Sequence, residues 1–232
     1  MLEVGAGTGG TTKRLAAALS AAGVQVRYTF TDISPSLVSK AKNVLGQQYS
    51  WMEFATFNLE KEIPAALRQR YDIVIGTNCV HATTDRTASC SRLGDALLPG
   101  GIVVLSEVTH VIDWYDGCFG LLDGWWLAEK RTAYPIQPAK VWMASYAAAG
   151  FASASYSGGP TPESRTQQLL MACNRHWDTS HPTTALNTNG PDGISLRQET
   201  VVYKEVSGVQ IHADIFFPTR SSISLMPIGT RA

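Results

Sequence analysis

A glycine-rich turn at the start of the chain most constrains how this sequence can fold. Glycine recurs directly after the short run Leu-Glu-Val of residues 2–4, at Gly5, Gly7, Gly9 and Gly10. Glycine adopts positive φ angles at little cost and lets a ligand approach the backbone closely. A helix that begins near Thr11 would direct its unpaired N–H groups toward such a ligand. The pattern predicts a strand-to-helix turn that binds a nucleotide-like molecule.

Two classes of cofactor-binding protein use a turn of this kind. Gly5, Gly7 and Gly10 match the dinucleotide fingerprint G-x-G-x-x-G. Glu3, Gly5, Gly7 and Gly9 match the E-x-G-x-G-x-G pattern of S-adenosylmethionine-dependent methyltransferases. A glycine-rich turn that binds nothing is the third possibility. The glycines alone do not separate these alternatives, so the downstream sequence has to decide.

Composition narrows the class of protein. The chain has 232 residues, of which 44% are hydrophobic, and its formal net charge is zero. A neutral chain argues against a nucleic-acid partner held by a basic surface. No apolar run reaches the ~20 residues that span a bilayer, and the N-terminus has no secretory signal. We expect a cytoplasmic protein with neither a nucleic-acid nor a membrane partner.

The cysteines point to no metal site. The four of them, Cys79, Cys90, Cys118 and Cys173, are scattered and form no C-x-x-C pair. No histidine and cysteine cluster has the spacing of zinc ligands. We expect four free thiols.

Strand and helix patterns alternate five times from the N-terminus. Helices are expected over 11–22, 36–45 and 85–98, and strands over 24–31, 51–59, 71–78 and 102–107. The strands over 71–78 and 102–107 are apolar throughout their centres, which is typical of parallel strands buried on both faces. A helix over 138–149 and two strands, over 151–156 and 168–173, follow as an antiparallel edge. This order predicts a doubly wound α/β domain.

Polar side chains follow several of these strands, where a cofactor would bind. Asp32 ends the second strand and can accept hydrogen bonds from two ribose hydroxyls, or it can cap the next helix. Asn58 follows the third strand and can bond the adenine edge, or it is a turn residue. Glu3 and the end of the fourth strand at Asn78 would lie near the methionyl and sulfonium end. The predicted cofactor-binding residues are Glu3, Gly5, Gly7, Gly9, Asp32, Ile33, Asn58 and Asn78.

His81 and Glu107 lie at or just past the ends of the fourth and fifth strands, which face the ligand crevice of an open α/β sheet. A histidine can remove a proton at neutral pH. A carboxylate bonded to the other ring nitrogen fixes its tautomer and stabilises the imidazolium. We predict a catalytic dyad; a structural histidine and a helix-capping glutamate are the alternative. Such a base would deprotonate the atom that accepts the methyl group. That atom can be an oxygen, a nitrogen or an acidic carbon.

A methyltransferase fits the chain better than a dehydrogenase does. A short-chain reductase would need a Tyr-x-x-x-Lys motif, and no tyrosine of this chain has a lysine four positions on. The aromatic and glycine-rich segment 110–126 is unlike a core. It reads as a substrate lid or wall, because apolar groups with a few polar ones line small-molecule pockets. A packed surface insertion is the alternative.

Several stretches together resemble a known family: residues 2–12, 28–34, 78–83, 98–101 and 114–126. They resemble the C-methyltransferase domain of fungal non-reducing iterative polyketide synthases, close to the citrinin synthase type. The resemblance covers residues 2–174. It implies a Rossmann-like, class I methyltransferase fold, which is a mostly parallel seven-stranded sheet with helices on both faces.

The resemblance also implies a reaction. Such domains use S-adenosyl-L-methionine to methylate the α-carbon of a poly-β-keto thioester held on an acyl carrier domain, among neighbouring synthase domains. A dyad that matches His81 and Glu107 promotes loss of the α-proton there. A non-catalytic cofactor-binding remnant and a small-molecule O-methyltransferase stay open as alternatives.

The expected domain organisation has three parts. Residues 1–174 form the methyltransferase domain, without the N-terminal subdomain that the family has before the glycine turn. We therefore expect weak or no turnover from this polypeptide alone. Residues 175–199 read as a linker. Residues 200–232 resemble the start of an α/β-hydrolase or thioesterase-like domain, with a hairpin that turns near residues 207–208, but the chain has no G-x-S-x-G nucleophile motif.

Overall fold

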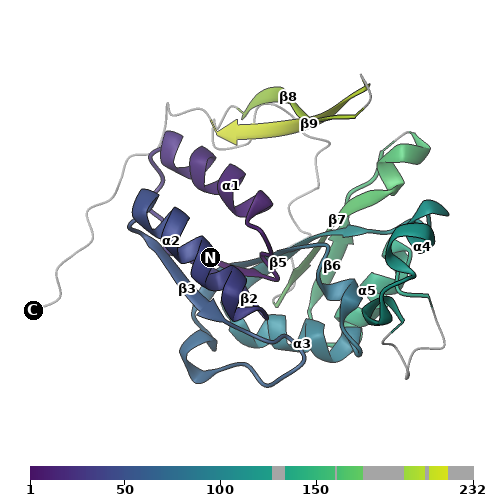
Figure 1. Cartoon of the computed structure of the whole chain (residues 1–232), viewed down its shortest axis with the longest axis horizontal. Coiled ribbons are helices and arrows are strands. Elements are labelled where there is room, and N and C mark those ends of the chain that lie inside the picture. Colours follow the sequence, from purple (N-terminus) through teal and green to yellow (C-terminus); the bar gives the residue numbers. More distant parts are fainter. Residues whose placement is uncertain (127–133, 160, 175–195, 207–208, 219–232) are drawn as a thin grey trace, which may run out of the picture. The chain divides into compact units, whose positions relative to one another are not determined.

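The computed structural model describes residues 1–126, 134–159, 161–174, 196–206 and 209–218. The chain divides into two compact units, Met1–Trp177 and Asp178–Ala232. The first unit contains a seven-stranded sheet and the second a two-stranded sheet (Figure 1).

The first unit is built on a sheet of strand order β3-β2-β1-β4-β5-β7-β6. Its strands are β1 (Leu2–Val4), β2 (Tyr28–Asp32), β3 (Met52–Thr56), β4 (Tyr71–Thr77), β5 (Leu97–Val108), β6 (Ser153–Tyr156) and β7 (Gln167–Cys173). The first five strands pair in parallel, whereas β7 runs antiparallel to both β5 and β6. The predicted mostly parallel sheet with an antiparallel edge is thereby confirmed.

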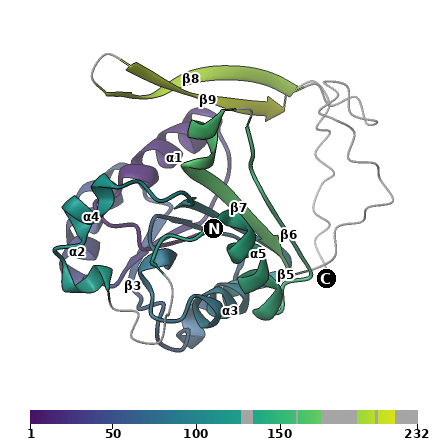
Figure 2. The same cartoon turned by 90° about the vertical axis from the view of Figure 1, so that its right-hand side faces the viewer.

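Helices cover both faces of this sheet. The α-helices are α1 (Gly10–Ala21), α2 (Pro35–Gln48), α3 (Arg86–Ala96), α4 (Trp114–Phe119) and α5 (Ala139–Ala148). The short 3₁₀ turns are η1 (Ala65–Leu67), η2 (Val80–Ala82), η3 (Asp123–Trp125) and η4 (Pro162–Arg165). In Figures 1 and 2, α1 and α2 lie together, apart from α3 and α5.

Two apolar clusters form the core, one on each face. Phe30 of β2 is buried with Ala16 of α1 and Leu45 of α2. Val74 of β4 is buried in the other cluster, with Leu93 of α3 and Trp142 of α5. Because burial of apolar surface stabilises a fold in proportion to the area removed from water, these clusters hold the strand ends in place.

Several element boundaries differ from the sequence predictions, and three of these differences have a physical reason in the structure. β2 begins at Tyr28 rather than at residue 24, because its pairing with β3 begins at Tyr28 and its pairing with β1 begins at Thr29. α2 continues through Gly46, which packs against Phe54 so closely that an added Cβ would lie 3.3 Å from the ring. β5 includes the expected turn at residues 99–101, as an irregularity with Gly100 at φ 88°.

The second unit contains β8 (Leu196–Val206) and β9 (Val209–Pro218), which pair antiparallel. β8 begins inside the stretch predicted as a linker, and residues 175–195 of that linker lie outside the described residues. The predicted turn at residues 207–208 and the chain after 218 lie outside them as well. Among the described helices, none is long and apolar enough to cross a bilayer.

Candidate active site

The glycine turn between β1 and α1 has the geometry that its sequence predicts. Gly5, Gly7 and Gly9 adopt φ angles of 57°, 58° and 77°, a region that other residues enter only at a cost. An added Cβ at Gly5 would lie 2.4 Å from the Cβ of Cys79, whereas at Gly7 it would meet nothing closer than 4.0 Å. Gly9 is the N-cap of α1, and no side chain caps that helix. The turn is therefore closed toward Cys79 and open over Gly7.

Asp32 joins this turn to the end of β2. Its Oδ2 accepts a hydrogen bond from the Gly7 N–H at 2.8 Å, and its Oδ1 accepts one from the Ser34 N–H at 2.8 Å. Ser34, not Asp32, is the N-cap of α2, so the helix-cap alternative for Asp32 is wrong. A carboxylate has about four lone-pair sites, and two bonds leave Asp32 able to accept hydroxyl donors.

Glu3 lies deeper than the other predicted cofactor ligands. Its side chain is buried, and Oε2 accepts hydrogen bonds from the Thr12 hydroxyl at 2.6 Å and the Tyr28 hydroxyl at 2.5 Å. Burial raises the pKa of Glu3 from its ordinary value, against the effect of these two donors. Glu3 thus ties β1, α1 and β2 together behind the glycine turn.

Ile33 and Asn58 follow β2 and β3, the two strands beyond β1. The Ile33 side chain is 60% exposed directly after Asp32, an unusual position for a large apolar group. Asn58 Oδ1 accepts a hydrogen bond from the Glu60 N–H at 2.8 Å. Asn58 is therefore a turn residue, which was the alternative prediction for it. The turn engages the side-chain oxygen of Asn58 and not its amide nitrogen.

Asn78 directly follows β4 and has a left-handed backbone conformation, with φ 48°. Its N–H donates to the Ser106 carbonyl at 2.8 Å, and its Oδ1 accepts from the Val108 N–H at 3.1 Å. Both bonds reach β5. The side chain is exposed, so Asn78 shapes the backbone turn that leads to His81.

Glu107 and His81 meet as the sequence predicts. Glu107 is fully buried at the end of β5, and its Oε1 accepts hydrogen bonds from the Cys79 N–H at 3.1 Å and the Val80 N–H at 2.9 Å. Its Oε2 lies 2.7 Å from His81 Nδ1, and the His81 side chain is 13% exposed. An ionised Glu107 places the ring proton on Nδ1 and the accepting lone pair on Nε2, a tautomer assigned from this network.

Cys79 links the dyad to the glycine turn, and the sequence analysis missed this role. Its Sγ lies 3.4 Å from the Val4 carbonyl, and its side chain faces Gly5 and Gly76. Burial raises the pKa of Cys79 well above its ordinary value, and the nearby Glu107 carboxylate raises it further, so the thiol stays neutral. Only the fold brings residue 79 beside residue 5; no local pattern signals that contact.

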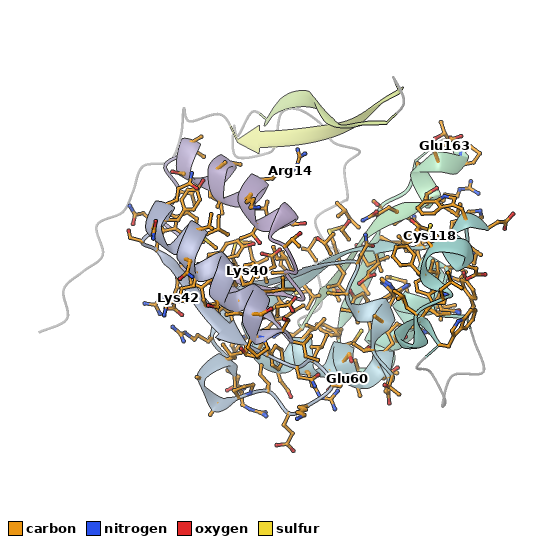
Figure 3. All side chains as sticks on the ribbon, in the orientation of Figure 1. Arg14, Lys40, Lys42, Glu60, Cys118 and Glu163 are labelled. Carbon is orange, nitrogen blue, oxygen red and sulfur yellow. The ribbon has the colours of Figure 1, made fainter. Side chains whose placement is uncertain are left out.

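Trp125 is the second residue that was missed as a neighbour of the dyad. Its ring makes a T-shaped contact with the His81 imidazole, with centroids 6.1 Å apart and an interplanar angle of 70°. The predicted lid or wall, residues 110–126, therefore reaches the dyad through η3. Cys118 of the same segment is exposed on α4 (Figure 3).

These residues fit an adenosyl cofactor on several independent grounds. The cradle over Gly7 is open, Asp32 can accept hydroxyl donors, and Ile33 offers apolar surface beside it. No cluster of three potential metal ligands occurs among the described residues. All four cysteines are free thiols, as expected.

Comparison with known proteins shows what the chain is similar to. Residues 2–103 match the family described as methyltransferase domain. The chain is 48% identical to the non-reducing polyketide synthase atr1 of Stereocaulon alpinum, over 99% of this chain and 9% of that protein. It is 39% identical to the non-reducing polyketide synthase mapC of Penicillium brevicompactum, over 94% of this chain and 9% of that one. The chain thus spans about a tenth of these relatives.

Solved structures agree with this assignment. The citrinin polyketide synthase CMeT domain superposes with a TM-score of 0.73 at 37% identity, over 76% of this chain and 46% of that chain. The trans-methyltransferase CalH, in complex with SAH, superposes with a TM-score of 0.66 at 32% identity, over 74% of this chain and 50% of that chain. The chain thus contains a methyltransferase domain, and the proteins it resembles are non-reducing polyketide synthases and the CMeT domain of the citrinin polyketide synthase.

Proposed function

We propose that the first unit transfers a methyl group from S-adenosylmethionine to the α-carbon of a β-keto thioester carried by an acyl carrier domain. When bound, the cofactor supplies an electrophilic methyl group on a sulfonium and leaves as S-adenosylhomocysteine. The glycine turn, Asp32 and Ile33 would hold its adenosyl part. Glu3, Asn58 and Asn78 would support this site from the ends of β1, β3 and β4.

The dyad supplies the base. His81 Nε2 takes the α-proton of the β-keto thioester, and the electron pair of the broken C–H bond delocalises into the adjacent carbonyls as an enolate. Glu107 Oε2 holds the Nδ1 proton and stabilises the imidazolium that forms. The enolate carbon is then the nucleophile that the reaction requires.

One observation carries this proposal: Glu107 accepts three hydrogen bonds, from His81 and from the backbone of Cys79 and Val80. Three donors meet at one buried carboxylate, and the contact with His81 fixes which ring nitrogen faces Glu107. Cys79, whose N–H donates to Glu107, also packs closely against Gly5, so one residue connects the base to the glycine turn.

The test is the His81→Ala substitution in the intact synthase that we propose contains this domain. Methylation of the product should fall by at least 100-fold, the scale of a lost general base. Binding of S-adenosylhomocysteine, measured by calorimetry, should not change. His212→Ala, which changes a histidine of β9 in the second unit, is the matched control. Unchanged methylation by His81→Ala would remove the dyad from the mechanism.

The position of the methyl group tests the acceptor. Mass spectrometry of the product made with isotopically labelled S-adenosylmethionine should locate the label on carbon. A label on oxygen would replace this proposal with an O-methyltransferase. Cofactor binding without turnover in the intact synthase would indicate a non-catalytic cofactor-binding module.

A further inference from the structure

Asp116 on α4 is the meeting point of two aromatic side chains from different parts of the chain. Its Oδ1 accepts a hydrogen bond from the Trp125 indole N–H at 3.1 Å and another from the Tyr134 hydroxyl at 2.5 Å. An ionised acceptor makes both bonds stronger than neutral ones. One carboxylate oxygen thus fixes the polar ends of two rings.

Further aromatic rings contact the indole of Trp125. Phe119 stacks on it, with centroids 5.4 Å apart and an interplanar angle of 22°, and Tyr115 lies at 6.4 Å. Tyr134 approaches edge-on at 6.0 Å. These contacts restrict the position of the indole, and the hydrogen bond to Asp116 is directional, so it also restricts the rotation of the ring.

The oriented indole lies beside the dyad. The ring of Trp125 is T-shaped against His81, on the imidazole whose Nδ1 faces Glu107. The energy of a contact between two aromatic rings depends on their relative orientation, so a rotation of the indole would disturb its packing against the imidazole. A fixed indole therefore helps to keep the imidazole in place beside Glu107.

We infer that Asp116 is a positioning residue, which orients Trp125 and through it supports the His81 imidazole. This inference rests on the proposed function in one respect, which is that His81 is the base. Asp116 acts on His81 indirectly, through the indole of Trp125. It acts only through the indole N–H.

The Tyr134 hydroxyl completes the arrangement as a donor. Its pKa is raised to about 12, first by burial and next by the hydrogen bond to Asp116. The hydroxyl therefore stays protonated at neutral pH and keeps donating to Oδ1. Asp116 Oδ1 therefore keeps both of its donors, the Tyr134 hydroxyl and the Trp125 indole N–H.

The first experiment reads the geometry without turnover. In the full chain, the imidazole resonances of His81 are followed by NMR, because the ring current of Trp125 acts on them. Asp116→Ala should shift these resonances, whereas Asp116→Asn, which keeps an oxygen acceptor, should leave them near their original positions. Asp113→Ala is the matched control, since Asp113 is an exposed carboxylate of the same segment without a side-chain cap bond. Should Asp116→Ala not fold, Asp116→Leu, which has the branched shape of the aspartate side chain and cannot accept the indole N–H, should shift the same resonances.

The second experiment asks whether Asp116 acts through Trp125 in catalysis. In the intact synthase, Asp116→Ala should lower kcat about 3- to 10-fold, the scale of a lost contact between two aromatic rings, with an unchanged KM for S-adenosylmethionine. In a Trp125→Phe background the same substitution should have no further effect, because the donor that it orients is gone.

The outcomes separate this inference from the proposed function. His81 resonances that stay in place in Asp116→Ala, or kcat losses that simply add in the double variant, would overturn the positioning role. Methylation that survives His81→Ala would overturn the proposed base, whatever the resonances do. A kcat loss in Asp116→Asn as large as in Asp116→Ala would also count against the inference.

Discussion

Gly5 and Gly7 share one backbone conformation but differ in their neighbours. Both have φ near +57°, so an alanine at either position carries the cost of the left-handed region, about 1–2 kcal/mol. Only at Gly5 would the new Cβ also collide with Cys79, at 2.4 Å. Alanine substitutions at the two glycines therefore distinguish the cost of the left-handed backbone from the cost of the collision with Cys79.

Gly5→Ala should accordingly destabilise the chain more than Gly7→Ala does. We expect a further loss of about 1–3 kcal/mol in the free energy of unfolding, the scale of overpacking, as measured by urea denaturation. Gly5→Ala should also weaken binding of S-adenosylhomocysteine at least tenfold, because the turn has to shift away from Cys79. Equal losses of stability in the two variants would show that Cys79 yields to the new methyl group.

Glu107 offers a sharper substitution than removal of the side chain. In Glu107→Gln the amide oxygen would stay with the Cys79 and Val80 N–H groups, so the amide N–H₂ would face His81. Nδ1 would then become the acceptor, and the ring proton would move to Nε2, where the base needs its lone pair.

Methylation by Glu107→Gln should fall by about two orders of magnitude or more, with cofactor affinity retained. The assay is turnover of labelled S-adenosylmethionine in the intact synthase, paired with calorimetry. Glu163→Gln is the control, because it makes the same chemical change at an exposed residue of η4. Figure 3 labels Glu163. Full activity in Glu107→Gln would show that the tautomer of His81 has no part in the reaction.

At the scale of elements, the two helices that follow β2 and η2 begin with different caps. Asp85 Oδ1 accepts from the Ala88 N–H at 2.9 Å at the start of α3. Ser34 Oγ accepts from the Leu37 N–H at 3.5 Å at the start of α2, which also has a proline in its first turn. A carboxylate also interacts favourably with the helix dipole.

Asp85→Ala should therefore cost more stability than Ser34→Ala. We expect about 1 kcal/mol for Asp85→Ala and a few tenths for Ser34→Ala, seen as a difference in melting temperature by circular dichroism. Ser34→Ala should leave Asp32 in place, because the bond from Ser34 to Asp32 comes from the backbone N–H. The reverse order of the two losses would contradict the geometry of the caps.

At the scale of the whole molecule, Glu3 makes the stability of the first unit depend on pH. Its pKa in the folded chain lies above the ordinary 4.5, because burial disfavours the charged form. The unfolded chain therefore releases this proton first as the pH rises, and the folded state loses stability between pH 4.5 and the raised pKa. The loss is about 1.4 kcal/mol for each unit by which the pKa is raised.

Glu3→Gln should remove this decline while an amide oxygen still accepts from Thr12 and Tyr28. The difference in unfolding free energy between the variant and the original chain should grow in favour of the variant from acid to neutral pH. Urea denaturation across that range measures it, with cofactor absent. A difference that shrinks as the pH rises would mean that the two hydroxyl donors outweigh burial.

The order of elements could be read from the chain because each depends on neighbours in sequence. The alternation around residues 2–107 and the glycines at 5, 7 and 9 predicted the parallel sheet and the turn. Element boundaries could not be read in this way. Val24 alternates like a strand residue but is 51% exposed, because no strand pairs with that stretch.

For the candidate site, the sequence by itself determined which residue types stand at the strand ends, among them Asp32, His81 and Glu107. Only the tertiary structure decided which atoms meet: Cys79 against Gly5, and Trp125 beside His81. The physical reason is the separation in sequence over which each property acts. Turn geometry and burial periodicity are local properties of the chain, whereas packing contacts join residues that are far apart in sequence and exist only once the sheet has formed.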